Sequence, residues 1–552
     1  ATSTFKIGGR LTRISPNTGS VGTVVTLEGD GFGSPDGLRV DFGDASGYNV
    51  RSLNITGGTF ATTFTVNTQG FGTTTITVTG IQSNATAQGI FTITPNIINV
   101  IPLSGTVGSG VTVSGNGFAS LEEISLQFGD MTGIVTGSAT ATGSFTLQFT
   151  VNTQGYGITG ITVKNISDQT RYAATSTYRI MPRIIEFTPI TGTVGCLVTI
   201  SGNGYGANST VNIMLGTTLR RSTPASSGGS FTTTFTIDTQ GYGPTTVIAT
   251  GTTYFESDSR SFSIQPAIWQ VTPSGGTVGA TISIRGNGYA TATVINVWFG
   301  SRAASITTTN TDAQGSWTTS FIIDTQVYGT TSLLAKGVGN ESATNTVKIL
   351  SKIILVSPNA GTVGSTVEIA GNGYKSGEII QIDFGTDSKL PPTNVYVTPT
   401  GSFTRSFVVT TQPYGATTVR AYIEITGITI TEATSTYSIS PNIISVVPAQ
   451  GTVGSSVTVT GNGYTASQTI TIDFGDGGLE ITTGSSTVEG SFTIPFSVNL
   501  QAYGTKIVRA RYGVQSSEKS WFTIIPNIRL VTPVSGTVGS QVSVEGDGYG
   551  AG

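Results

Sequence analysis

The chain has 552 residues, of which only 10% are charged, with 26 basic against 29 acidic side chains and a net charge of −3. This balance excludes the clustered basic surface with which nucleic-acid recognition begins. The absence of histidine removes the usual general base and the commonest transition-metal ligand. A single cysteine excludes intrachain disulfides and Cys-rich metal sites, and no apolar run is long enough for a transmembrane helix. We therefore expect neither catalytic activity nor a nucleic-acid partner.

Residues 1–8 begin with ATSTFKI, which matches residues 174–180 (ATSTYRI) and 433–439 (ATSTYSI). Because those two segments close later repeats, residues 1–8 are predicted to be the last strand of a truncated preceding domain. We expect the chain to be a window from a longer polyprotein. Donor-strand exchange, in which this orphan strand completes a neighbouring molecule, is the alternative.

A long repeat follows, marked by the string Gly-Thr-Val-Gly or a variant of it. The string begins at Gly19, Gly105, Gly192, Gly276, Gly361, Gly451 and Gly536, at steps of 86, 87, 84, 85, 90 and 85 residues. Such units are longer than solenoid repeats, which run to roughly 20 to 50 residues. The predicted domains are residues 9–94, 95–181, 182–265, 266–350, 351–440 and 441–525, and residues 526–552 hold the first strands of a truncated following domain.

The opening strand of each repeat contains one position of unusual composition. The first and fourth positions are apolar, as in Ile97 and Val100, and are predicted to face the core. The second position holds Ile98, Ile185, Trp269, Ile354 and Ile444. It is Thr12 in the first repeat and Arg529 in the last, so we expect it to be at least partly exposed. We predict that these five side chains make interdomain or intersubunit contacts; packing under a loop of the same domain is the alternative.

Alternating strands fill the rest of each repeat. Phe231, Phe235 and Ile237 alternate with threonines and Asp238, as in a strand with one buried face. β-Branched residues dominate these runs and Asn-Gly or Gly-Ser pairs interrupt them, so helices have almost no room. About seven short strands per repeat match an immunoglobulin-like sandwich. The predicted fold class is all-β, a tandem array of immunoglobulin-like β-sandwiches joined by short proline-containing linkers.

Paired carboxylates occur on a predicted turn in two repeats, at Asp41 and Asp44 and at Asp473 and Asp476. Carboxylates combined with backbone oxygens are the ligands that calcium prefers. The equivalent turns at residues 127–130 and 214–217 lack the pair. We therefore favour a tight turn that tolerates aspartate and predict no resident cofactor, with calcium as the alternative.

Asn-x-Ser/Thr sequons begin at Asn54, Asn84, Asn165, Asn208 and Asn340. They would suit a glycosylated exterior. Their number is close to chance for a chain this rich in serine and threonine, so glycans are left open as partners.

Residues 443–475 contain Ile-x-x-Val-x-Pro, then Gly-Thr-Val-Gly-Ser-x-Val-Thr-Val-x-Gly-Asn-Gly-Tyr, then Ile-Asp-Phe-Gly. This segment resembles the IPT/TIG type of immunoglobulin-like domain. The second half of each repeat, from Gly-Ser-Phe-Thr through Tyr-Gly-Thr, resembles the tandem bacterial Ig-like repeats of prokaryotic surface proteins, including S-layer proteins and adhesin stalks. The resemblance covers all six repeats and both fragments. It implies the fold and an extracellular, cell-surface setting, and it transfers no catalytic residue.

Six sandwiches joined by short linkers predict a rod. With few charges, its exterior is rich in Thr, Ser, Gly and Asn, so copies of the chain can pack without electrostatic repulsion. We expect a structural extracellular protein that self-assembles with copies of itself into a surface layer, sheath or filament. The alternative is an adhesin or stalk that holds a binding domain away from the cell surface.

Overall fold

The computed structural model describes residues 5, 7–43, 55, 57–168, 173–390, 394–513 and 515–550. These residues form strands, turns and loops, and none of them is helical. The described part of the chain thus offers no helix long and apolar enough to cross a membrane. The chain divides into two compact units, Ala1–Gln265 and Pro266–Gly552.

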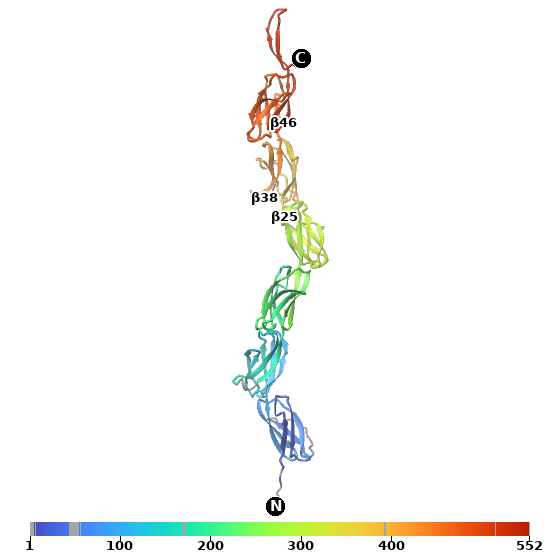
Figure 1. The fold of residues 1–552 in the computed structure, drawn as a ribbon, viewed down its shortest axis with the longest axis vertical. Helices are drawn as coiled ribbons and strands as arrows, with labels where there is room; N and C mark the ends of the chain where they lie inside the picture. Colours follow the sequence, from blue (N-terminus) through green and yellow to red (C-terminus); the bar gives the residue numbers. More distant parts are fainter. Residues whose placement is uncertain are drawn as a thin grey trace. The chain divides into compact units, whose positions relative to one another are not determined.

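Strand formation follows the predicted alternation of apolar residues and threonine. In β13 (Phe145–Thr150), Phe145, Leu147 and Phe149 are buried, and the residues between them are exposed. Period-two alternation places the apolar side chains on one face of the sheet, where a second sheet covers them. The predicted all-β class is confirmed: the chain is a tandem array of immunoglobulin-like β-sandwiches (Figure 1).

The second sandwich shows how the two layers form. One layer has the order β13-β10-β8 and the other the order β12-β11-β14-β15-β9. The opening strand changes layers, since β8 pairs antiparallel with β10 while β9 pairs parallel with β15. The remaining strands of this sandwich are β8 (Asn96–Ile101), β9 (Ser104–Gly105), β10 (Gly110–Asn116), β11 (Glu123–Phe128), β12 (Met131–Ser138), β14 (Gly157–Asn165) and β15 (Ala173–Ile180).

The first unit holds two further sandwiches, one on each side of the second in sequence. Sandwich 1 pairs a three-stranded with a four-stranded sheet, and sandwich 3 a three-stranded with a five-stranded sheet. The strands of sandwich 1 are β1 (Arg10–Ser15), β2 (Thr18–Gly19), β3 (Val24–Asp30), β4 (Leu38–Phe42), β5 (Phe60–Thr65), β6 (Gly72–Gly80) and β7 (Thr86–Ile93). Those of sandwich 3 are β16 (Arg183–Thr188), β17 (Thr191–Thr193), β18 (Leu197–Asn203), β19 (Thr210–Leu215), β20 (Thr218–Pro224), β21 (Phe231–Thr236), β22 (Gly243–Gly251) and β23 (Ser257–Gln265).

The second unit holds sandwiches 4, 5 and 6, built in the same way. The strands of sandwich 4 are β24 (Ala267–Thr272), β25 (Gly275–Thr277), β26 (Thr281–Asn287), β27 (Val294–Phe299), β28 (Thr307–Asn310), β29 (Trp317–Ile322), β30 (Gly329–Gly337) and β31 (Ser342–Leu350). Those of sandwich 5 are β32 (Lys352–Ser357), β33 (Ala360–Gly361), β34 (Thr366–Asn372), β35 (Gln381–Phe384), β36 (Phe403–Val408), β37 (Gly415–Ile425) and β38 (Ile428–Ile439). Those of sandwich 6 are β39 (Asn442–Val447), β40 (Gln450–Gly451), β41 (Ser456–Asn462), β42 (Thr469–Phe474), β43 (Leu479–Ser485), β44 (Phe492–Ser497), β45 (Gly504–Tyr512) and β46 (Gln515–Ile524).

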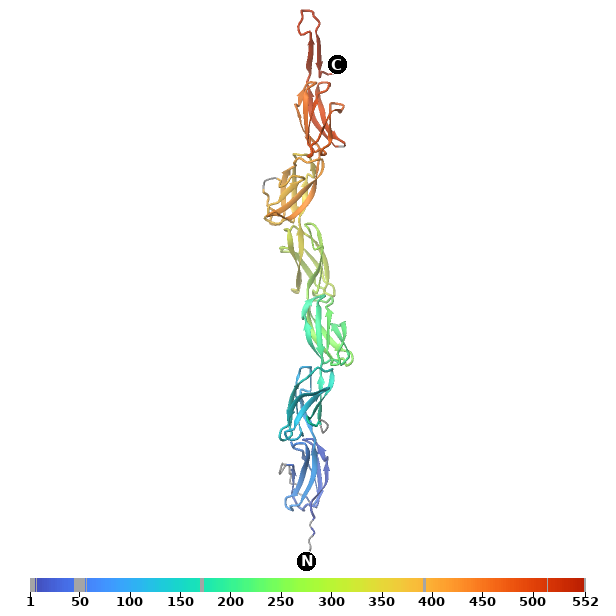
Figure 2. The same cartoon turned by 90° about the vertical axis from the view of Figure 1, so that its left-hand side faces the viewer.

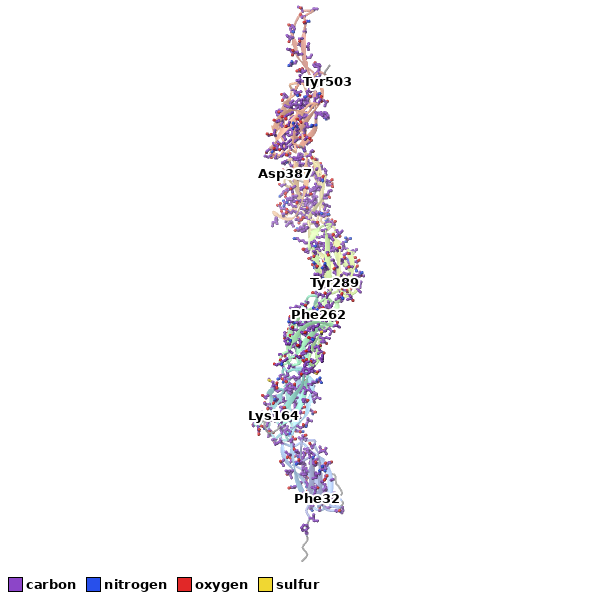
Figure 3. All side chains as sticks on the ribbon, in the orientation of Figure 1. Phe32, Lys164, Phe262, Tyr289, Asp387 and Tyr503 are labelled. Atoms are coloured by element: carbon purple, nitrogen blue, oxygen red, sulfur yellow. The ribbon has the colours of Figure 1, made fainter. Side chains whose placement is uncertain are left out.

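Each sandwich has its own hydrophobic core, and each core draws its residues from one of the six predicted repeat ranges. Aromatic side chains bridge the two layers, as where the rings of Phe128 and Phe149 lie 5.0 Å apart. Phe262 and Tyr289 are fully buried in sandwiches 3 and 4 (Figure 3). Separate cores allow each sandwich to fold as a unit.

The two ends of the chain carry shorter pieces. Strands β47 (Asn527–Thr532) and β48 (Ser543–Asp547) form a two-stranded sheet, seen at the red end of Figure 2. In it Val544 is 58% exposed, whereas its counterpart Val459 in sandwich 6 is fully buried. Of the predicted last strand at residues 1–8, residues 1–4 and 6 lie outside the described residues, and Phe5, Ile7 and Gly8 belong to no strand.

Candidate interaction surfaces

The second position of each opening strand is the extra residue of a β-bulge. In β8, Ile97 pairs with Gly115 and Asn99 with Ser114, so Ile98 has no partner on β10. The same register shift recurs in every opening strand, and the residues skipped by it are Thr12, Ile98, Ile185, Trp269, Ile354, Ile444 and Arg529. A bulge interrupts the alternation of the strand, and it accounts for two consecutive outward-facing positions in each strand.

The five apolar bulge residues, called the bulge column below, are about half exposed. Their exposed fractions are 54% for Ile98, 57% for Ile185, 55% for Trp269, 51% for Ile354 and 59% for Ile444. Within the described chain, about half of each of these side chains is therefore not covered by its own domain. The role of the bulge column in contacts with other domains or subunits stays a prediction.

The backbone next to the bulge column is poorly suited to pairing with another strand. Each opening strand is an edge strand of its three-stranded sheet. In sandwich 3, Asp258 accepts a hydrogen bond from the Ile184 N–H (2.7 Å), and Arg260 donates to the Ile184 carbonyl. Bulges and side-chain caps blunt an edge strand. The surface therefore offers side chains, and little free backbone, to a partner.

The described calcium candidates lie against cationic side chains. Asp41 pairs with Arg39 (2.9 Å), Asp473 with Arg511 (2.8 Å) and Asp476 with Lys506 (2.5 Å). Asp44 lies outside the described residues. Among those described, no group of three or more Asp, Glu, His or Cys side chains is placed to hold a metal ion. The structure thus gives these aspartates ion-pair partners within their own sandwich.

The Phe-Gly turn that carries these aspartates receives a glutamine from elsewhere in its sandwich. Gln154 donates from Nε2 to the Phe128 carbonyl and to Asn152 Oδ1, both at 2.9 Å. Gly129 has a φ of +56°, and a Cβ built on it would overlap the Gln154 amide. Sequence reasoning missed this link, although glutamine recurs at the same place in all six repeats, as Gln69, Gln154, Gln240, Gln326, Gln412 and Gln501.

The described sequon asparagines fall into two groups. Asn84, Asn208 and Asn340 have φ values of 51°, 54° and 72°, in the left-handed region that asparagine tolerates in turns. Asn165 donates from its side-chain amide, the nitrogen that a glycan would modify, to Glu122. Asn54 lies outside the described residues, and glycosylation stays a prediction.

Consecutive sandwiches within each unit are joined by a recurring backbone hydrogen bond. The donor is the backbone N–H of the aromatic residue in the Thr-Gln-x-aromatic-Gly loop, which is called the donor loop below. The acceptor is the backbone carbonyl of the aromatic residue that ends the Gly-Asn-Gly-Phe/Tyr motif in the next sandwich. The pairs are Phe71 N to Phe118 O (3.0 Å), Tyr156 N to Tyr205 O (2.8 Å), Tyr328 N to Tyr374 O (3.1 Å) and Tyr414 N to Tyr464 O (3.1 Å). Two motifs far apart in sequence therefore meet at each of these junctions.

The acceptor residue is fixed by its own sandwich. The Tyr205 ring is fully buried, packs edge-to-face on Phe231 at 5.1 Å, and donates its hydroxyl to the Ala249 carbonyl at 3.5 Å. The Tyr205 N–H donates to the Gly229 carbonyl at 3.0 Å. Burial raises the pKa of the Tyr205, Tyr289 and Tyr374 phenols, and that of Tyr464 to about 12. A residue held at ring and N–H presents its carbonyl at one defined position.

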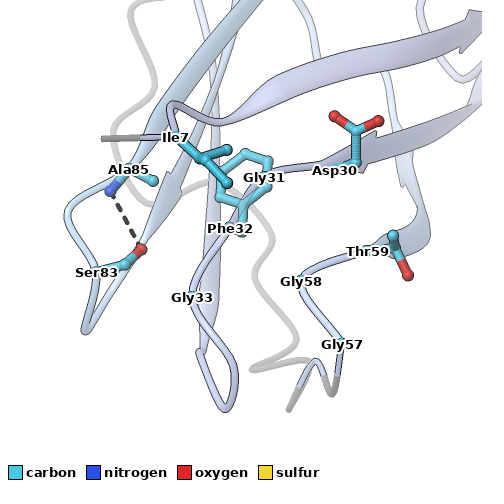
Figure 4. A pocket seen from close by; sticks show the side chains of 10 residues that line it. All are labelled: Ile7, Asp30, Gly31, Phe32, Gly33, Gly57, Gly58, Thr59, Ser83 and Ala85. Carbon is cyan, nitrogen blue, oxygen red and sulfur yellow. Dashed lines mark hydrogen bonds between the residues drawn. The ribbon is translucent and has the colours of Figure 1, made fainter. Parts of the chain in front are cut away.

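The corresponding end of sandwich 1 contains Phe32 (Figure 4). A cavity of about 540 Å³ lies there beside Phe32, and Gly31, Gly58, Ser83 and Ala85 are among the residues that line it. In sandwich 2 the equivalent place, next to Phe118, is occupied by the donor loop of sandwich 1.

Residues 10–93 match the IPT/TIG domain family. This segment is the first sandwich, so the match confirms the predicted resemblance there. A comparison with curated protein sequences gives no match.

Among solved structures, similar chains include native α-2-macroglobulin of E. coli (10% identity, TM-score 0.15, covering 95% of this chain and 47% of that one). Others are the N-terminal eight Ig domains of Down Syndrome Cell Adhesion Molecule (14%, 0.17, covering 95% and 73%) and a tetra-tandem repeat from the extending region of a large adhesion protein (14%, 0.18, covering 63% and 98%). The chain spans about half the length of the α-2-macroglobulin. The tandem Ig-like fold stated above rests on the sheets themselves.

Proposed function

We propose that the chain is a structural, non-catalytic array of Ig-like sandwiches that acts at the cell exterior and assembles with copies of itself into a layer, sheath or filament. The bulge column carries the proposal, because it exposes one large apolar side chain in each of sandwiches 2 to 6. Burying the exposed half of such a side chain gains on the order of 1 kcal/mol. Few charges oppose the approach of a second copy, since only 10% of residues are charged.

Replacing the bulge column by threonine tests the proposal, because Thr12 already occupies this position in sandwich 1. The variant combines Ile98→Thr, Ile185→Thr, Trp269→Thr, Ile354→Thr and Ile444→Thr. Sedimentation velocity over a concentration series should show reversible assemblies for the unmodified chain and loss of these assemblies in the variant. Electron microscopy of the assembled material would show repeating lateral contacts.

The matched control removes five equally exposed apolar side chains outside the bulge column. These are Ile90, Ile158, Leu197, Ile322 and Val408, with exposed fractions of 61%, 75%, 58%, 61% and 56%. Threonine at these five positions should leave assembly intact. A chain that stays monomeric at all concentrations, or a bulge-column variant that still assembles, contradicts the proposal.

A stalk that spaces a binding domain from the cell surface is the second candidate. The backbone hydrogen bonds between consecutive sandwiches favour it, because they tie neighbouring sandwiches together without any second copy. A stalk needs no lateral contact, so a chain that stays monomeric would support this candidate. Neither candidate requires a cofactor, a nucleic acid or a catalytic residue, and glycans remain compatible with both.

A further inference from the structure

A glycine lies at each described junction, at the point where the donor loop meets the next sandwich. It belongs to the turn before the Phe-Thr strand, and its φ is +77° in Gly143, +73° in Gly229, +82° in Gly401 and +77° in Gly490. A Cβ built on these glycines would lie 3.0, 2.8, 2.7 and 3.0 Å from the Cα atoms of Gly70, Gly155, Val327 and Pro413 in the preceding donor loop. At Gly143, Gly229 and Gly490 the Cβ would also lie 2.1 Å from the carbonyl oxygen of the aromatic acceptor residue in the same sandwich, so glycine serves both its own turn and the approach of the donor loop.

A second glycine accommodates the linker between the sandwiches. At the junction of sandwiches 1 and 2, a Cβ on Gly117 would lie 3.0 Å from the Thr94 carbonyl carbon and 3.1 Å from the Pro95 Cα. Gly204 faces Met181 in the same way at the next junction. Each junction therefore has three contacts, namely the linker, the donor loop on the turn glycine, and the hydrogen bond to the aromatic carbonyl.

Three separate contacts define an orientation, whereas a linker alone leaves two domains free to rotate. The contacts are made by backbone atoms, and the donor-loop residue against the turn glycine is Gly, Val or Pro. At the junction of sandwiches 2 and 3, side chains of the donor loop add to these contacts: the Tyr156 ring lies 5.8 Å from the Tyr254 ring, and Thr153 Cγ2 lies 3.3 Å from a Cβ built on Gly228.

We propose that this three-point junction locks consecutive sandwiches within each unit into one rigid body, with the turn glycine as its positioning residue. The inference goes beyond the proposed function and does not depend on it, because it concerns a single dilute chain. Lateral assembly can fail while the junctions hold, and the reverse is also possible.

Sandwich 1 supplies the matched control. Its turn glycine, Gly58, has a φ of +70°, and the described atom nearest to a Cβ on it is the Phe32 carbonyl oxygen of the same sandwich, at 2.9 Å. No donor-loop atom is among the described atoms nearest to this Cβ. Gly58→Ala therefore measures alanine at this φ with a milder overlap inside the sandwich, because the carbonyl oxygen that lies at 2.9 Å here lies at 2.1 Å from a Cβ on Gly229.

Spin-label distance measurements on the full chain test the proposal. Cys196→Ser removes the native thiol, and serine occupies this slot in other repeats. Labels on Thr177→Cys in sandwich 2 and Thr232→Cys in sandwich 3 then report one junction, both positions being exposed. We expect one narrow distance distribution between the two labels in the Cys196→Ser chain. The distribution should become broad when Gly229→Ala is added and should stay narrow when Gly58→Ala is added.

A second variant keeps the test decisive if Gly229→Ala unfolds sandwich 3. Gln154→Ala disorganises the donor loop from the side of sandwich 2 and leaves every residue of sandwich 3 unchanged, so it should also broaden the distance. Hydrogen exchange resolved by sandwich shows which sandwiches stay folded. A broad distribution in the background chain, a narrow one in both junction variants, or equal broadening in Gly58→Ala overturns the proposal.

Discussion

Sandwiches 1 and 2 carry the same acceptor end, built around Phe32 in one and around Phe118 in the other, and the donor loop of sandwich 1 contacts the acceptor of sandwich 2. Phe32 and Phe118 donate their N–H groups to the turn glycine at 3.2 and 3.1 Å. Their rings pack edge-to-face on Phe60 and Phe145 at 5.3 and 5.4 Å. The exposed fraction is 6% for Phe32 and 0% for Phe118. Each sandwich therefore builds this end from its own residues.

The largest expected effect comes from removing the acceptor ring in both sandwiches. Phe32→Ala and Phe118→Ala should each destabilise their own sandwich by about 3–5 kcal/mol, because each ring is nearly or fully buried and packs against a second aromatic ring. Peptide-resolved hydrogen exchange gives the free energy of opening for each sandwich. If Phe32→Ala costs less than half as much as Phe118→Ala, the two rings do not play the same part in their cores.

Alkaline pH should separate the sandwiches with tyrosine at the acceptor from those with phenylalanine. Burial raises the pKa of Tyr464 to about 12 from the ordinary value of 10.0, so folding favours the neutral phenol. This stabilisation is complete below pH 10 and is lost as the pH rises through about 12. We expect sandwich 6 to lose about 2–3 kcal/mol over this range, and Phe32 in sandwich 1 to contribute no such loss.

Tyrosinate absorbance and circular dichroism during alkaline titration measure this effect. Tyr464→Phe should abolish the contribution of sandwich 6, at a cost of about 1 kcal/mol at neutral pH because the hydrogen bond to the Ala510 carbonyl (2.9 Å) is lost. An unchanged alkaline transition in this variant would show that other groups control it.

The smallest expected effect concerns the rim of the two acceptors. Arg10 and Asp30 pair across the strands of sandwich 1, where sandwich 2 has Asn96 and Asn116. The ion pair (2.8 Å) is exposed, with side-chain exposures of 71% and 39%, so solvent screens it. Asp30→Asn should leave the calorimetric Tm unchanged at low and moderate salt. A clear drop would mean that rim charge contributes to the difference between the two ends.

The extent of sequence-based prediction differs between the strands and the junctions. Alternation in Phe231, Phe235 and Ile237 predicted the buried face of β21, because it depends on neighbouring residues alone. The exposure of the bulge column followed from one comparison, that the same position accepts Trp269 and Arg529. The bulge itself was not predicted, since it is defined by counting residues on two paired strands.

The junction was missed for a related reason. The Thr-Gln-x-aromatic-Gly motif and the Gly-Asn-Gly-Phe/Tyr motif are far apart in the sequence. Phe71 of the first motif and Phe118 of the second, for example, are separated by 47 positions. Nothing in either marker says that the N–H of one reaches the carbonyl of the other. The aspartates of the Phe-Gly turn drew attention to calcium, whereas Gly129 of that turn leaves room for Gln154, which shapes the donor loop.

The sequence by itself determined the repeat, the all-β class and the inward and outward faces of the strands, because these depend on local composition and period. Only the tertiary structure decided which backbone groups contact each other between consecutive sandwiches and why glycine is required at those contacts. Those choices depend on how closely two distant backbones approach. The distance between two backbones is set by the folded surfaces, and the sequence contains no periodic pattern that predicts it.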